Sequence, residues 1–316
     1  PRSMLNLKIK KILFTCRDPA STETIGNFIS ISDLINCKDL DFRIISQSPG
    51  FEIIKQKYTF LEPKLDFLDI TSDKKKLLQK CYNYTDFYDP VCIITGISGP
   101  DSGLDEAFLN VANKKKIKSF AFQNYWGDFN HAFNSEPDCY LVLDEYAKKQ
   151  TRKFSKKKIK IVGSIKNELF IGLDVQNLRQ KYRSRINIQD EILFSFAGQP
   201  INDKNYLSSI NLIVKFISTN FKNSFFIYRP HPKENKMLRN YISEICKENN
   251  QNFLIENTQK TFEQFICASD VLISVYSTCC YELQYLIMLS KKQLGVPLYL
   301  MSKKMKKYFK KFCELD

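Results

Sequence analysis

Short apolar runs alternate with helical segments along both halves of this 316-residue chain. In the first half, residues 11–16, 91–94 and 118–123 have the composition of buried strands, and each run ends in a polar loop. Strands that alternate with helices pair in parallel, because two parallel strands need a crossover between them. The alternation therefore predicts an α/β fold with a parallel sheet in each half.

The alternation breaks once. The first series closes with strands at 139–143 and 159–164, and a new series begins at Glu191. We expect the domain boundary within residues 165–174, which gives domains at 4–168 and 169–316. The chain length suits two α/β domains of ordinary size.

The first domain opens with a strand, followed by a polar loop expected at 17–26 and a helix expected at 27–35. This order is typical of a Rossmann-like domain. The loop lacks the Gly-x-Gly-x-x-Gly pattern that brings backbone close to a dinucleotide pyrophosphate. An NAD or FAD cofactor is therefore not supported.

One of only two histidines, His231, lies between Pro230 and Pro232, just after the apolar run 224–228. Each proline fixes its own φ and biases the preceding residue toward extended geometry. At the carboxyl end of a parallel strand, a histidine held in this way points to where ligands bind in open α/β sheets. A proline-rich turn with an incidental histidine is the alternative, and the residues alone leave both open.

A second polar group follows the short apolar run 271–274. Ser277 or Thr278 stands at the N-cap of a helix that begins directly afterwards. A helix N-terminus offers free N–H groups and partial positive charge, which suits a phosphate. Plain capping explains one of the two hydroxyls. Glu282, one turn into the helix, is either an acceptor for a ribose diol or a solvated helix residue.

The second domain begins with an apolar strand at 191–197 that ends in Gly198-Gln199-Pro200. Glycine permits close approach of a ligand to the backbone. Gln199 can hydrogen-bond to a donor phosphate, a base or an acceptor. A strand that ends in a turn explains the glycine and the proline but not the glutamine.

Together these strand ends resemble bacterial glycosyltransferases of the GT-B fold that use CMP-activated sugars, a group that includes sialyltransferases, polysialyltransferases and some Kdo transferases. The resemblance rests on His231-Pro232 and Ser277-Thr278, in that order, and on Gly198-Gln199-Pro200. It covers most of the C-terminal half. In that group the His-Pro and Ser/Thr motifs contact the nucleotide phosphate.

The resemblance implies two Rossmann-like domains whose parallel sheets face a central cleft, with the acceptor on the first domain and the nucleotide sugar on the second. It also implies transfer of a nonulosonic (sialic-type) acid or Kdo from a CMP-sugar to a hydroxyl of a bacterial surface glycan. Inversion at the sugar and independence from metal ions and further cofactors belong to this prediction.

Two alternatives remain open. CDP-glycerol glycerophosphotransferases of teichoic-acid synthesis carry a related pattern, Arg-Pro-His-Pro followed by Ser-Asp-x-x-Ile-Ser-x-Tyr-Ser, which matches residues 229–232 and 269–277. Transfer of glycerol phosphate or ribitol phosphate is therefore the second hypothesis. The third is a non-catalytic protein that binds polyanions or membranes on a degenerate transferase fold.

The resemblance further implies an acidic catalytic base in the first domain, within an Asp/Glu-Asp/Glu-Gly motif. The nearest match, Asp101-Ser102-Gly103, has serine in place of the second acid. We predict that Asp101 deprotonates the acceptor hydroxyl. Asp105 and Glu106 are alternative bases or sugar contacts, although we expect them to lie one helical turn further on and to point elsewhere.

Polar and aromatic residues alternate in the loop 124–131. Asn124, Trp126 and His131 are candidates for contacts to the acceptor or the donor sugar, since ligand sites combine aromatic faces with a few polar groups. His131 is also a reserve catalytic residue. An aromatic plug that closes the edge of the sheet is the alternative.

The net charge of +14 suits an anionic nucleotide-sugar donor. Residues 301–312 predict a helix with an apolar face flanked by lysines, the pattern of a helix on anionic lipid, although packing on the protein body fits equally well. No nucleic-acid-binding module is recognisable, so no nucleic acid partner is expected. Without metal-ligand spacing, disulfide signals or a membrane-spanning run, the prediction is a cytoplasmic enzyme that is peripheral at the inner face of the membrane.

Overall fold

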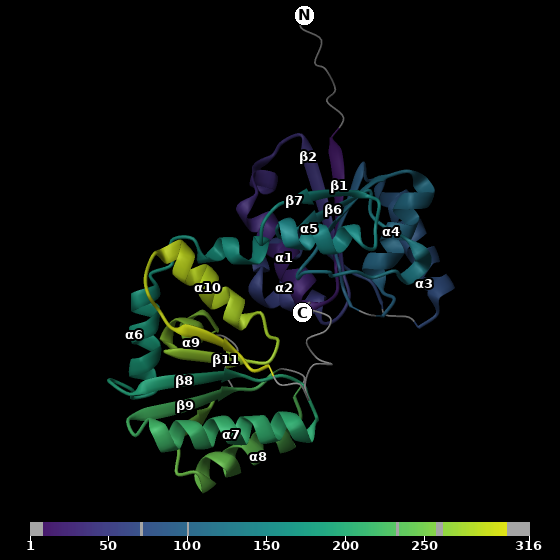
Figure 1. Cartoon of the computed structure of the whole chain (residues 1–316). Coiled ribbons are helices and arrows are strands. Elements are labelled where there is room, and N and C mark those ends of the chain that lie inside the picture. The colour runs from purple at the N-terminus through teal and green to yellow at the C-terminus, as the bar shows by residue number, and fades with distance from the viewer. Residues whose placement is uncertain (1–8, 70–71, 100, 232–233, 257–261, 302–316) are drawn as a thin grey trace, which may run out of the picture. The chain divides into compact units, whose positions relative to one another are not determined.

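The computed structural model of the chain describes residues 9–69, 72–99, 101–231, 234–256 and 262–301. The chain divides between Glu168 and Leu169 into two compact units, each with its own sheet (Figure 1). Pro232 and residues 302–312 of the expected basic helix lie outside the described residues. The lipid contact of that segment therefore stays a prediction.

The first unit is built on a seven-stranded sheet in which every strand pair is parallel. The strand order is β3-β2-β1-β4-β5-β6-β7, so the chain first builds outward from β1 and then returns to its other side. The point of reversal, between β1 and β4, is a topological switch point. The elements are β1 (Lys10–Cys16), α1 (Pro19–Ile31), η1 (Asp33–Asn36), β2 (Leu40–Ser46), α2 (Gly50–Lys57), η2 (Thr59–Lys64), β3 (Leu65–Phe67), α3 (Lys74–Tyr88), β4 (Cys92–Gly96), α4 (Leu104–Lys115), β5 (Lys118–Phe122), η3 (Ala132–Asn134), β6 (Cys139–Val142), α5 (Glu145–Arg152) and β7 (Lys158–Ile161).

The second unit contains a five-stranded parallel sheet in the order β10-β9-β8-β11-β12. Its switch point lies between β8 and β11. Helices α7 and α8 cover one face, and α6, α9 and α10 cover the other (Figure 1). The elements, beginning with the η4 turn that spans the boundary, are η4 (Ile165–Phe170), α6 (Val175–Arg185), β8 (Ile192–Ala197), α7 (Lys204–Asn220), β9 (Ser224–Arg229), α8 (Lys236–Glu248), β10 (Phe253–Ile255), α9 (Phe262–Ala268), β11 (Val271–Ser274), α10 (Cys279–Ser290) and β12 (Val296–Tyr299).

The central strands are apolar at successive positions because both of their faces are covered. Leu13 packs into one core with Phe108 of α4, and its neighbour Phe14 packs into another with Ile25 of α1. Parallel strands in α/β folds are buried on both sides, so an apolar run rather than an alternating pattern marks them. The predicted α/β class with parallel sheets is confirmed.

The first helix differs from the prediction. It begins at Pro19 rather than at residue 27, so most of the expected loop is helical. Asp18 is the N-cap residue and Pro19 is at the first helical position, where a proline is well accommodated. The residues that follow are polar but buried, among them Ser21, Thr22 and Thr24, which is why an apolar pattern did not mark this helix.

No helix in the described part of the chain is both long and apolar enough to cross a membrane. The described residues contain no group of three or more His, Cys, Asp or Glu side chains placed to hold a metal ion. The described cysteines are free thiols.

Phe196 tests whether the second unit has a core of its own. This β8 side chain is fully buried against Tyr228 and Tyr206. Phe196→Ala should lower the free energy of unfolding of the second unit by about 3–5 kcal/mol, because it leaves a cavity. Leu212→Ala on α7, where the side chain is 69% exposed, is the control and should change it by less than about 0.5 kcal/mol. Urea denaturation followed by circular dichroism measures both, and equal effects would contradict this assignment of the core.

Candidate functional site

Each unit has a cluster of polar side chains at the carboxyl ends of its strands, beside the switch point. This edge is where ligands bind in open α/β sheets, because helices on opposite faces diverge there.

In the second unit, hydrogen bonds beyond the last strand pairs hold three neighbouring strand ends together. Gly198 N–H donates to the Arg229 carbonyl (2.8 Å), which ties the end of β8 to β9. On the other side, Gln199 Oε1 accepts from Tyr276 N–H (2.9 Å), and Ser274 Oγ donates to the Ala197 carbonyl (3.3 Å). Adjacent strands lie about 4.8 Å apart, so the residues that follow them are near neighbours. The structure therefore brings the ends that carry Gln199, His231 and Ser277 to one sheet edge.

Gln199 itself is buried, and its side-chain oxygen is committed to the Tyr276 amide. It thus fixes the loop that leads to the Ser-Thr pair. This arrangement accounts for the glutamine that a simple turn left unexplained.

The two hydroxyls before α10 have different roles. Ser277 is half-buried, and its Oγ accepts from the N–H of Cys279, the first residue of the helix (3.3 Å). Thr278 is exposed and occupies the N-cap position without a side-chain capping bond. Its Oγ1 instead donates to Glu282 Oε1 (3.2 Å). One hydroxyl caps the helix, and the other stands at an exposed helix N-terminus, which favours anions.

Glu282 is only 2% exposed, so its interpretation as a solvated helix residue is wrong. The carboxylate lies within the first turn of α10 beside Thr278. Contact with a ribose stays a prediction.

A buried carboxylate holds the loop that carries His231. Glu234 Oε2 accepts from Tyr228 Oη (2.8 Å) and from the backbone N–H of His231 (3.1 Å). A Cβ at position 198 would lie 2.5 Å from Tyr228 Oη and 2.8 Å from the same carboxylate oxygen, so glycine is needed there. Burial raises the pKa of Glu234. Sequence reasoning gave Glu234 no role, because its partners are set by the sheet rather than by the motif.

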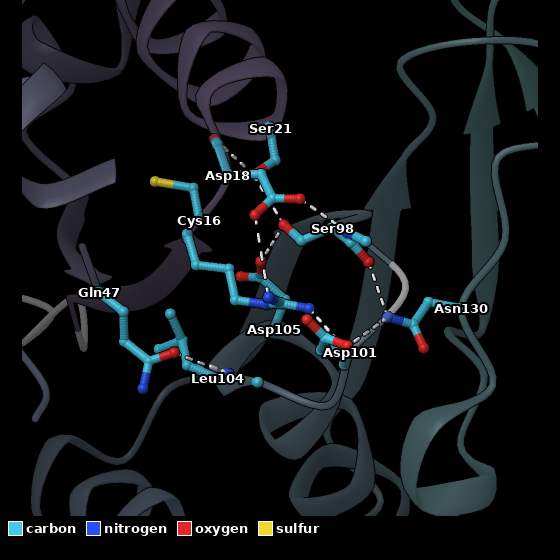
Figure 2. A network of polar contacts seen from close by, with 12 residues as sticks. Cys16, Asp18, Ser21, Gln47, Ser98, Asp101, Leu104, Asp105 and Asn130 are labelled. Atoms are coloured by element: carbon cyan, nitrogen blue, oxygen red, sulfur yellow. Dashed lines mark hydrogen bonds and ion pairs between the residues drawn. The ribbon is translucent and has the colours of Figure 1, made fainter. Parts of the chain in front are cut away.

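In the first unit, side chains directly after β1 and in the loop after β5 hold the loop at Asp101 (Figure 2). Arg17 Nη2 donates to the Asp101 carbonyl (2.6 Å), and Asn130 Nδ2 donates to the same oxygen (3.0 Å) and to the Ser98 carbonyl (2.7 Å). Asp18 Oδ2 accepts from Gly99 N–H (2.7 Å). The loop backbone is thus fixed, whereas the residue Asp101 is exposed.

Asp105 and Glu106 do not point away from this loop, as the sequence suggested, but lie buried beneath it. Asp105 is 1% exposed and accepts from both Thr15 Oγ1 and Ser98 Oγ, each at 2.6 Å. Glu106 Oε2 accepts from Gly103 N–H (2.9 Å) and pairs with Arg17 (3.3 Å). Burial raises the pKa of both carboxyls.

Both ends of the Asn124 side-chain amide and its backbone N–H form hydrogen bonds within the protein. Thr24 Oγ1 donates to its side-chain oxygen (2.9 Å), and its Nδ2 donates to the Ile97 carbonyl (2.9 Å). Its backbone N–H donates to the buried Asp128 carboxylate (2.9 Å). These contacts favour a role for Asn124 in shaping the loop.

The two candidate rings of this loop, those of Trp126 and His131, differ in exposure. Trp126 is half-buried, and its Nε1 donates to Asp144, the N-cap of α5 (2.8 Å). His131 is exposed, with its ring 3.9 Å from that of Phe129. The tryptophan therefore fits the edge-plug interpretation, and the histidine is accessible.

Sequence reasoning also missed Arg17 and Asp18. Both directly follow β1 at the switch point, and both bond to the loop after β4. Asp18-Pro19, one residue beyond the predicted strand 11–16, is a helix-start signal that would have placed both residues at this edge.

The structure is similar to solved structures of nucleotide-sugar enzymes. It matches UDP-GlcNAc 2-epimerase from Neisseria meningitidis bound to UDP-GlcNAc with a TM-score of 0.66 and 13% identity, covering 94% of this chain and 85% of that chain. UDP-GlcNAc 2-epimerase from Methanocaldococcus jannaschii matches with a TM-score of 0.63 and 14% identity, covering 96% and 93%. A glycosyltransferase from Rickettsia africae matches with a TM-score of 0.62 and 11% identity, covering 96% and 88%.

No family model matches the sequence, and no curated protein matches it. At these identities the structural likeness concerns the fold. The chain has the GT-B-type fold of two Rossmann-like, parallel-sheet domains that these epimerases and this glycosyltransferase share.

Asp128 gives the first unit a pH-dependent stability. Burial raises its pKa from the ordinary 3.8 to about 7. Between these values the folded protein retains a proton that the unfolded chain has released, so the free energy of unfolding should fall as the pH rises from 4 to 7. Asp128→Asn should make the decline from pH 5 to pH 8 shallower, as measured by urea denaturation. A slope as steep as that of the wild type would contradict this assignment.

Proposed function

We propose that the chain is a metal-independent, inverting glycosyltransferase that moves a nonulosonic acid or Kdo from a CMP-sugar to a hydroxyl of a bacterial surface glycan. The observation that carries the proposal is the meeting of Gln199, His231 and the Ser277-Thr278 pair at the ends of three neighbouring strands. These residues match the motifs of CMP-sugar transferases in identity and order, and they lie where α/β folds bind ligands.

In this proposal the second unit stabilises the departing CMP. The His231 imidazole, the hydroxyls of Ser277 and Thr278, and the N-terminus of α10 surround negative charge that develops on the phosphate. Such donors lower the activation free energy most when they are already in position, because no reorganisation is then needed during the reaction. Glu234 supports this because it holds the His231 backbone.

Asp101 is proposed as the base that takes the acceptor proton. Its loop is anchored through backbone carbonyls, which leaves the carboxylate accessible. Asp105 and Glu106 are buried and already accept two hydrogen bonds or ion pairs each, so we propose that they position the loop. A single base that assists direct attack gives inversion.

A UDP-linked substrate is the second candidate, because the fold neighbours include epimerases named for UDP-GlcNAc. A CDP-alditol is the third, from the Arg-Pro-His-Pro pattern. Thermal-shift titrations with CMP, CDP and UDP separate these classes. Stabilisation by UDP alone contradicts the CMP-sugar and CDP-alditol versions, and identification of the transferred group separates those two.

His231→Ala should lower kcat for transfer from CMP-sugar by about 10²–10³-fold, the effect of losing one transition-state donor. CMP release and glycan product, measured together in steady state, give this value. The thermal unfolding midpoint serves as the control for intact folding. Near wild-type turnover in a folded variant would remove His231 from the mechanism.

Asp101→Asn should retain CMP binding and abolish transfer, because the carboxylate acts on the acceptor rather than on the nucleotide. Calorimetric titration with CMP and a transfer assay measure the two effects separately. An active Asp101→Asn enzyme beside an inactive Asp105→Asn, Glu106→Gln or His131→Ala enzyme would move the base to that residue. Normal transfer by all four variants would reject the first unit's part in the mechanism.

A further inference from the structure

A cavity of about 350 Å³ opens at the carboxyl edge of the second sheet, on the side covered by α7 and α8. Its wall combines Leu207 of α7 with Met237, Leu238 and Tyr241 of α8. Pro200, which directly follows Gln199, and Glu234, three residues after His231, also line it, together with the polar residues Asn202 and Asn235. Along the chain the cavity therefore adjoins Gln199, which fixes the loop before the Ser-Thr pair, and lies close to His231 of the proposed phosphate site.

Glu234, which lines this cavity, has one carboxylate oxygen without a hydrogen-bond partner among the described residues. The residue is 8% exposed, and Oε2 is occupied by Tyr228 and the His231 amide. Oε1 is buried and has no hydrogen-bond partner among the described residues. A buried polar atom without a partner costs free energy that a donor from a ligand would recover. After a small change in its side-chain conformation, Glu234 is thus suited to accept a hydrogen bond from an N–H group of a ligand in the cavity.

We propose that this cavity is the nucleobase subsite and that Glu234 accepts a hydrogen bond from the exocyclic amine of cytosine. The inference rests on the proposed function and adds the residue that selects the base. Apolar and aromatic walls with a few polar groups, here Asn202, Glu234 and Asn235, suit a planar ring. Carboxylates pair with the cytosine amino group, whereas uracil carries a carbonyl at the same position and cannot donate there.

The test is the ratio of CMP affinity to UMP affinity, measured by calorimetric titration of the full chain. Wild-type protein should prefer CMP by about tenfold or more, the effect of one hydrogen bond to a charged group. Glu234→Gln should bring the ratio close to one, since an amide serves either base. Tyr228→Phe removes a partner of Oε2 but keeps Oε1, so it should retain the preference. If the role of Glu234 is purely structural, Glu234→Gln should weaken the binding of CMP and UMP equally and leave the ratio of their affinities unchanged, which would contradict the proposal.

A second pair of variants tests the cavity. Leu207→Trp fills it from α7 and should weaken CMP binding at least about tenfold. Leu212→Trp adds the same ring to the same helix at a position that is 69% exposed, and it should bind CMP like the wild type.

The outcomes separate this inference from the proposed function. If CMP binds and supports transfer but Glu234→Gln keeps the preference, or Leu207→Trp binds normally, the base lies elsewhere and the transferase proposal stands. If neither CMP nor UMP binds wild-type protein, both are rejected.

Discussion

In each unit the first strand pairs with a strand that does not follow it directly in the sequence: β1 pairs with β4, and β8 pairs with β11. Hydrogen bonds of buried side chains continue this connection beyond the backbone hydrogen bonds of the sheet. Gln199 links the end of β8 to the segment after β11. In the first unit, Asp105 bonds to Thr15 of β1 and to Ser98, which follows β4. These links fix the loops at each switch point. The accessible groups Asp101 and Thr278 therefore stand on supported backbone, and the proposed chemistry depends on that support.

These edges contain ionisable groups that the apolar cores exclude. Asp105, Glu106, Asp128 and Glu234 are all buried there, and burial raises the pKa of each. A buried carboxylate opposes folding unless hydrogen bonds compensate its lost hydration. Perturbed carboxyls gather at functional sites more often than elsewhere, which agrees with placing ligands at both edges. These carboxylates accept hydrogen bonds from backbone N–H groups or neighbouring side chains. Their proposed role is therefore to position the groups that contact the substrate.

The sequence predicted the parallel α/β class, because apolar runs mark strands that are covered on both faces. It also placed the α10 start at the Ser277-Thr278 pair, since capping is a local signal. It missed the start of α1, where buried hydroxyls replace the apolar face. It also could not foresee the burial of Asp105, whose partner Thr15 lies 90 residues away, or the anchoring by Glu234. Both depend on contacts that exist only once the strands pair.

The central claim is that CMP binds at the carboxyl edge of the second sheet. Hydrogen–deuterium exchange with and without saturating CMP tests it directly, because amides near the ligand lose access to solvent. Our account predicts slower exchange in the segments around His231 and at 275–282. Protection confined to the first unit, or exchange unchanged in the second unit at saturating CMP, would contradict it.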